Sequence, residues 1–166
     1  YSGKSFILFD EKDEMKISSS LIRNKIQEGS VESLPEYLGR YYQIEGTVVT
    51  GDKRGRTIGF PTANISPSFL YLLPKKGVYA VRLKWKDIWY NGILNLGYVP
   101  TFYEHLSEPT IEVHLLDFDE DIYGEHVTLE WRKWLRDEKK FASVDDLVKQ
   151  LNEDKKRGIE YFQFAI

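Results

Sequence analysis

The feature that most constrains the fold of this sequence is a series of five short runs rich in β-branched and aromatic residues. They cover residues 43–50, 77–85, 88–96, 110–118 and 126–135, with turn residues between them. Most of the runs have no long helical pattern between them, which disfavours parallel strands joined by crossover helices. We therefore predict a mainly β fold, with five or six antiparallel strands closed into a small barrel.

Helical patterns flank this β-rich region. Ser143 is a suitable N-cap for a C-terminal helix, and Asp145 and Asp146 would stand in its first turn, where carboxylates favour the helix dipole. The apolar residues that follow share one helical face (Val144, Leu147, Val148 and Leu151). A shorter helix is predicted near residues 18–29, and residues 30–39, which include Pro35, read as a connector.

Composition excludes several classes of function. The net charge of −3 and the pI of about 5.7 give no positive field that could hold DNA or RNA. The absence of cysteine excludes disulfides, thiolate metal sites and cysteine nucleophiles, and it fits a reducing compartment. No apolar run approaches the roughly 20 residues of a membrane span, and the first residues lack a signal-peptide pattern. We expect a cytoplasmic protein without nucleic-acid or membrane partners.

The segment Gly51–Ile65, GDKRGRTIGFPTANI, is the most informative stretch for function. Its three glycines would let backbone N–H groups approach a ligand, and its basic side chains add positive charge, an arrangement that suits phosphates. A hairpin with a flexible basic tip would explain the same glycine spacing. The spacing is not that of a Walker loop, so the glycines alone do not decide between these readings.

The end of this segment adds a hydroxyl and a carboxamide. If residues 60–64 are extended, Thr62 and Asn64 lie on the same side of the chain. Neutral oxygen ligands of this kind suit Mg²⁺, which keeps several waters and shares the phosphates of its substrate. The alternative is a turn in which these side chains cap a strand.

Two further charged residues are candidates for chemistry. Glu112 interrupts a strand whose other face is apolar, and it could accept a proton from an alcohol, or it could be an ordinary solvent-facing residue. Arg136 lies in a charged stretch between the last strand and the helix, where it could stack on a planar ligand or be simply solvated. The histidines have no metal-site spacing and receive no role (His105, His114 and His126).

Four segments of the sequence, in the same order and spacing, resemble the riboflavin kinase family. The resemblance extends from about Leu38 to the C-terminus and rests on GDKRGRTIGFPTANI, NLGYVPTF, PTIEVHLLDF followed by DIYG, and LRDEKKFAS. It implies a six-stranded antiparallel barrel with a C-terminal helix. It also implies an ATP:riboflavin phosphotransferase that uses Mg²⁺ and converts riboflavin to FMN.

The resemblance assigns roles to particular residues. Thr62 and Asn64 match the family's ligands of magnesium and ATP, and Asn64 is also expected to contact the flavin. Glu112 matches its catalytic base and Arg136 its flavin-side arginine. The loop that covers the nucleotide corresponds here to a segment with Gly51, Lys53 and Gly55. The family's Asn-x-Gly and Pro-Thr-Phe elements, which would line the pocket, correspond to Asn95–Gly97 and Pro100–Phe102.

A second resemblance concerns the N-terminal stretch. ISSSLIRNKIQEG is similar to the closing motif of the FMN adenylyltransferase module that bacteria fuse to this kinase. We therefore expect residues 1–36 to be a helical remnant of that module and residues 37–166 to be the kinase domain. In the parent protein, a bifunctional FAD synthetase, the module would be a partner in cis, but the present chain should not make FAD.

A function from another class is compatible with the same pattern. A closed antiparallel barrel with aromatic residues and loop arginines could bind flavin or single-stranded nucleic acid without catalysis. The acidic pI argues against nucleic acid.

Overall fold

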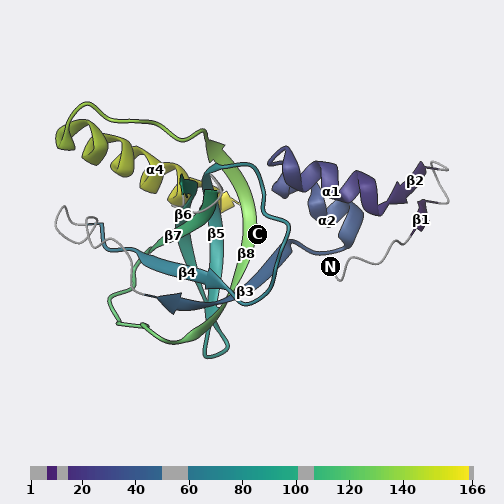
Figure 1. The fold of residues 1–166 in the computed structure, drawn as a ribbon, viewed down its shortest axis with the longest axis horizontal. Coiled ribbons are helices and arrows are strands. Elements are labelled where there is room, and N and C mark those ends of the chain that lie inside the picture. Colours follow the sequence, from purple (N-terminus) through teal and green to yellow (C-terminus); the bar gives the residue numbers. More distant parts are fainter. Residues whose placement is uncertain (1–6, 11–14, 50–59, 101–106, 165–166) are drawn as a thin grey trace.

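The computed structural model describes residues 7–10, 15–49, 60–100 and 107–164 (Figure 1). The described part of the chain begins with two paired antiparallel strands, followed by short helices and then by the β-rich region. The elements of the first part are β1 (Ile7–Asp10), β2 (Met15–Ser18), α1 (Ser19–Gln27), the 3₁₀ helix η1 (Val31–Ser33) and α2 (Leu34–Leu38). The short helix predicted near residues 18–29 is thus present, and the connector is helical as well.

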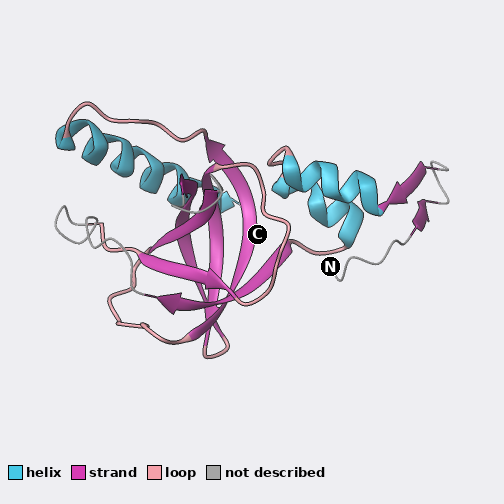
Figure 2. Ribbon diagram, viewed as in Figure 1, coloured by secondary structure: helices cyan, strands magenta, loops and turns pink. Residues whose placement is uncertain are grey.

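The β-rich region is a closed barrel of six antiparallel strands in the order β3-β4-β7-β6-β5-β8. The predicted fold is confirmed (Figure 2). The strands are β3 (Tyr42–Val49), β4 (Ala63–Pro67), β5 (Gly77–Trp85), β6 (Ile88–Pro100), β7 (Ser107–Leu115) and β8 (His126–Arg136). β4, which the pattern of β-rich runs did not reveal, contributes the extended segment with Asn64.

Alternating side chains of the strands fill the barrel. Trp131 of β8 and Tyr79 of β5 are fully buried, and their rings meet edge to face with centroids 4.9 Å apart. Tyr42 of β3 donates its hydroxyl to the carbonyl of Leu72 at 2.7 Å. Burial, with a smaller contribution from Tyr71, raises the pKa of Tyr42 to about 12, so the phenol stays a neutral donor.

The turn between β5 and β6 follows from local chemistry. Trp85 pairs with Ile88, which leaves Lys86 and Asp87 as a two-residue loop. Both have positive φ, 52° and 63°, as a type I′ hairpin turn requires. The sequence Trp85-Lys86-Asp87-Ile88 by itself predicts a hairpin turn, and the structure confirms it.

The N-terminal helices share the hydrophobic core of the barrel. Ile22 and Ile26 of α1, Val31 of η1 and Leu34 are buried in the same cluster as the barrel side chains. Residues 19–38 thus pack as part of one core with the domain that follows. The origin of residues 1–36 in an adenylyltransferase module stays a proposal.

The C-terminal helix α4 (Val144–Phe164) lies beside the barrel (Figure 1). The hydroxyl of Ser143 accepts the Asp146 N–H at 3.2 Å, which confirms the predicted cap. The helix continues through Gly158, where an added Cβ would overlap the side chain of Ile93 in β6. The missing side chain of Gly158 therefore allows a close approach between helix and barrel. In the described ranges of the chain, none of the helices is long and apolar enough to cross a membrane.

The packing of β5 against β8 can be tested at Gly77, at the start of β5. Its φ is 149°, and an added Cβ would lie 2.6 Å from the carbonyl oxygen of Arg136 and overlap the ring of Trp134. Gly77→Ala should therefore lower the free energy of unfolding by about 3 kcal/mol, from backbone strain plus steric overlap. Gly39→Ala is the matched control, because Gly39 also has a positive φ (76°) but open space around it. Equal losses in urea unfolding would contradict the steric argument.

Candidate functional site

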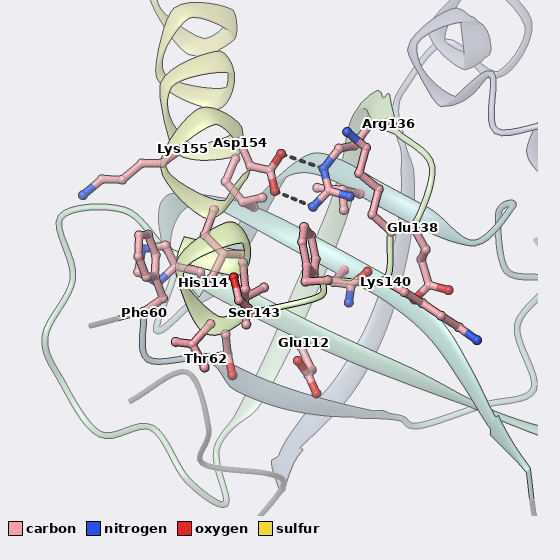
Figure 3. A pocket seen from close by; sticks show the side chains of 18 of the residues that line it. Phe60, Thr62, Glu112, His114, Arg136, Glu138, Lys140, Ser143, Asp154 and Lys155 are labelled. Atoms are coloured by element: carbon pink, nitrogen blue, oxygen red, sulfur yellow. Dashed lines mark hydrogen bonds and ion pairs between the residues drawn. The ribbon is translucent and has the colours of Figure 1, made fainter. Parts of the chain in front are cut away.

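A pocket of about 880 Å³ lies between the outer surface of the barrel and the C-terminal helix (Figure 3). Side chains of β6 and β7 line one wall, and the segment 138–143 and α4 line the other. The volume is in the range of pockets that enclose small organic ligands. The C-terminal helix is thus a wall of the candidate site as well as part of the fold.

A row of three polar residues crosses neighbouring strands at this surface. Glu112 of β7 is paired with Asn64 of β4 on one side and with Asn95 of β6 on the other. Directly paired residues of antiparallel strands face the same way, with Cβ atoms about 4.5–5.5 Å apart. Glu112 and Asn95 line the pocket. The fold therefore places a carboxylate between two carboxamides on the outer surface of the barrel. Asn64 is next to Glu112 in the sheet but is not among the residues that line the pocket.

Alternation along β7 explains why Glu112 faces the pocket. Ile111 and Val113 are 2% and 0% exposed and point into the barrel, so Glu112 and His114 must point out of it. Glu112 is half-buried, because the outer surface of β7 is covered there rather than open to solvent. Its setting is thus that of a group inside a binding pocket.

The segment before β4 forms the neighbouring part of the wall. Thr62 and Phe60 line the pocket together with His114. His114 donates its Nδ1–H to the carbonyl of Pro61 at 2.8 Å, since a carbonyl can only accept. The rings of Phe60 and His114 lie with centroids 5.4 Å apart. No role was predicted for His114 from the sequence, and its two-residue spacing from Glu112 was the one available signal.

Arg136 also lines the pocket, where its guanidinium is held by a buried carboxylate. Both oxygens of Asp154 accept from it, each at 2.7 Å, and Asp154 is 2% exposed. The Arg136 Nη1 donates to the carbonyl of Asp137 at 2.9 Å, and Gln150 donates to Asp154 at 3.0 Å. Figure 3 shows this pair at one end of the pocket and Thr62 with Glu112 toward the other.

Asp154 went unnoticed in the sequence because it is one of many charged residues on α4. Its partner lies 18 positions earlier on β8, so only the folded chain brings the two together. A bidentate pair of this kind joins the last strand of the barrel to the helix with a defined geometry. It therefore fixes the distance between the two walls of the pocket.

The segment between β8 and α4 contacts the helix on one side and the barrel on the other. Lys139 donates to the side chain of Gln150 on α4 at 3.1 Å. Glu138 approaches the barrel so closely at Gly97 that a Cβ there would overlap its carboxylate. The predicted element Asn95–Gly97 thus contributes in two ways, with Asn95 lining the pocket and Gly97 giving room to the facing segment.

Some predicted site residues cannot be placed. Gly51, Lys53 and Gly55, expected at the phosphates, lie outside the described residues, as do Thr101 and Phe102 of the predicted Pro100–Phe102 element. Among the described residues, no three histidine, aspartate or glutamate side chains form a cluster that could hold a metal ion. A magnesium site here would depend on neutral oxygens and on phosphate, as the sequence predicted for Thr62 and Asn64.

Comparison with known proteins identifies the family. Residues 38–162 match the family model for riboflavin kinase (flavokinase). The chain belongs to the riboflavin kinase family. The resemblance seen in the sequence is thereby confirmed, and the barrel with its pocket is a riboflavin kinase domain.

Curated relatives of this kinase family are about twice as long as the chain. The bifunctional riboflavin kinase/FMN adenylyltransferase of Bacillus subtilis is 48% identical over 164 residues, which cover 96% of the chain and 52% of the relative. The protein of the same name from Escherichia coli K12 is 40% identical over 151 residues, 89% of the chain and 47% of the relative. The chain thus spans about half the length of the curated relatives it matches.

Solved structures share the fold of this kinase domain. A Streptococcus pneumoniae structure described as a macrolide-efflux protein is 41% identical and superposes with a TM-score of 0.82 over 90% of the chain and 48% of its own. The riboflavin kinase of Trypanosoma brucei, 22% identical, gives a TM-score of 0.50 over 74% of the chain and 80% of its own. The second likeness concerns the fold alone.

The Arg136–Asp154 pair generates a stability prediction. Asp154→Ala leaves a largely buried guanidinium without its carboxylate, so the free energy of unfolding should fall by about 3–5 kcal/mol. Glu28→Ala breaks the exposed pair of Lys25 and Glu28 and should cost less than about 1 kcal/mol. Chemical denaturation of both variants measures the difference. A small loss in Asp154→Ala would mean that the helix does not depend on this pair.

Proposed function

We propose that this chain is a riboflavin kinase, which transfers the γ-phosphoryl group of ATP to the terminal ribityl hydroxyl of riboflavin and forms FMN. The observation that carries the proposal is the row of Asn64, Glu112 and Asn95 on the outer surface of the barrel, in a chain whose residues 38–162 match the riboflavin kinase model. Glu112 and Asn95 of this row line the 880 Å³ pocket. A carboxylate flanked by amides is suited to hold a hydroxyl group and to receive its proton.

Glu112 is proposed as the catalytic base. An ordinary carboxylate is far too weak a base to ionise an alcohol in advance, so proton transfer must follow the onset of bond formation to phosphorus. Before that, Glu112 would accept a hydrogen bond from the ribityl hydroxyl and align its oxygen with the phosphoryl group. Alignment of this kind supplies much of the rate in phosphoryl transfer.

Thr62 and Asn64 are proposed to hold Mg²⁺ and the phosphates of ATP. Their neutral oxygens belong to the ligand class that magnesium accepts, and Asn64 is paired with Glu112 in the sheet. When bound, magnesium would neutralise charge on the phosphates. The loop residues Gly51, Lys53 and Gly55 are proposed to bind the phosphates from the other side, as their resemblance to the family implies.

Arg136 is proposed to bind the isoalloxazine ring. It lines the pocket at the end away from Thr62 and Glu112, where the ring would lie if the ribityl chain extends toward Glu112 (Figure 3). Asp154 occupies the edge of its guanidinium, so contact with the flavin would use the planar face. Asn64, next to Glu112, would contact the ribityl part of the flavin.

The parent protein is proposed to be a cytoplasmic, bifunctional FAD synthetase with an FMN adenylyltransferase module in cis. The names and lengths of the curated relatives support this proposal. Small-molecule substrates and no nucleic-acid partner are expected, in line with the acidic pI of about 5.7.

The proposal is tested by incubating the chain with riboflavin, ATP and Mg²⁺ and measuring FMN and ADP by mass spectrometry. We expect one FMN for each ADP, and no ADP when riboflavin is left out. Riboflavin or FMN binding without any ADP would indicate a flavin-binding barrel that is not a kinase.

Replacement of Glu112 by Gln should lower kcat by about 10²–10⁴-fold with little change in the KM of riboflavin or ATP, because the amide keeps the shape but cannot take the proton. Glu108→Gln is the matched control, since Glu108 is an exposed glutamate on the same strand. Turnover close to that of the wild type in Glu112→Gln would refute the assignment of the base.

Replacement of Asn64 by Ala should instead weaken the binding of magnesium and of ATP. We expect the Mg²⁺ concentration for half-maximal activity to rise about tenfold, since a ligand is lost while Glu112 is kept. Ser66→Ala, two positions along the same strand at an exposed residue, should leave the titration unchanged. A magnesium titration of Asn64→Ala that overlays the wild-type curve would rule out this role.

A further inference from the structure

His114 connects two parts of the pocket wall that the sequence keeps far apart. It lies on β7, two residues after Glu112, and its Nδ1 donates to the carbonyl of Pro61 at 2.8 Å. Pro61 is 53 positions earlier in the chain and stands immediately before Thr62. A single side chain thus joins the strand with Glu112 to the segment with Thr62 and Asn64.

The hydrogen bond between His114 and Pro61 lies where the backbone pairing of β4 with β7 ends. The described pairing of β4 with β7 consists of Ala63 with Val113 and Asn64 with Glu112. Pro61 and Thr62 precede the first of these pairs, and proline has no N–H to donate to a ladder. The hydrogen bond from His114 therefore extends the attachment of this segment to β7 beyond the end of the paired strand.

The ring of His114 also packs against the same segment. The rings of Phe60 and His114 are tilted by 59°, with centroids 5.4 Å apart, and Phe60 is 9% exposed. A hydrogen bond to Pro61 and a ring contact to Phe60 act on adjacent residues. Together they restrict both the position and the direction of the chain as it enters Thr62.

We propose that His114 is a positioning residue for the nucleotide end of the site. It holds the segment Phe60–Asn64 against β7, so that Thr62 and Asn64 stand at a fixed distance from Glu112. The inference rests on the proposed kinase function, in which those residues bind ATP with magnesium and Glu112 holds the hydroxyl. In this role His114 acts through Thr62 and Asn64, and it need not touch either substrate.

Two variants separate the hydrogen bond from the ring contact. His114→Asn keeps an N–H donor at nearly the position of Nδ1, because both groups stand two bonds from Cβ, but it removes the ring. His114→Phe keeps an aromatic ring against Phe60 but cannot donate. His126→Phe is the control for introducing Phe at a strand histidine, since His126 is exposed on β8.

Kinetics give the first readout. In His114→Phe we expect the KM of MgATP to rise about tenfold while the KM of riboflavin changes little. The reason is that displaced Thr62 and Asn64 side chains would weaken the binding of MgATP and not that of riboflavin. His114→Asn should keep most of the wild-type KM for MgATP. Equal changes in both KM values, or no rescue by Asn, would overturn the inference in favour of a general packing role.

Hydrogen–deuterium exchange of a peptide covering residues 60–66 gives a readout that needs no activity. His114→Phe should lose protection in this peptide, whereas His114→Asn should keep it. Equal protection in the wild type and both variants would refute the inference. If the wild-type chain makes no FMN, the proposed function fails, and the exchange data still decide whether His114 holds this segment.

Discussion

Closure of the six-stranded ladder is the constraint on which the rest of this structure depends. Each strand has two neighbours, so its backbone groups are paired and its alternate side chains are divided between the interior and the outer surface. The interior is apolar and contains Trp131 and Tyr79. The same alternation that fills the core places Glu112 and Asn95 on the outside in a common row. Core formation and construction of the pocket wall are thus consequences of one register.

The outer row becomes a site only because α4 covers it. Tyr161 and Phe162 of α4 pack on an apolar cluster of the barrel that includes Val78, Ala80 and Ile93, and more specific contacts then fix the position of the helix. The Arg136–Asp154 pair and the missing side chain at Gly158 supply these at two different points. The hydrogen bond that Lys139 donates to Gln150 then holds the connecting segment. The pocket of this domain is thus an interface between barrel and helix.

Much of the fold was predictable, because it follows from local patterns. The β-rich runs, the turn at Lys86 and Asp87, and the cap at Ser143 each depend on a few neighbouring residues. β4 was not among the predicted β-rich runs, because it is short and begins after a proline-containing segment. Its extended form depends on pairing with β3 and β7. Likewise, no local pattern shows that apolar side chains of α1, η1 and α2 belong to the same buried cluster as the barrel side chains.

The sequence by itself determined the fold class, the family, and the residue types that could carry phosphoryl transfer. Glu112 stood out as a charged residue in an otherwise apolar strand. Thr62 and Asn64 stood out as a hydroxyl and an amide two positions apart. Only the tertiary structure decided which groups face one another. Asp154 with Arg136 and His114 with Pro61 are 18 and 53 positions apart, and nothing in their local sequence marks them as partners. Such contacts follow from strand register and helix docking, which are set by the whole closed barrel.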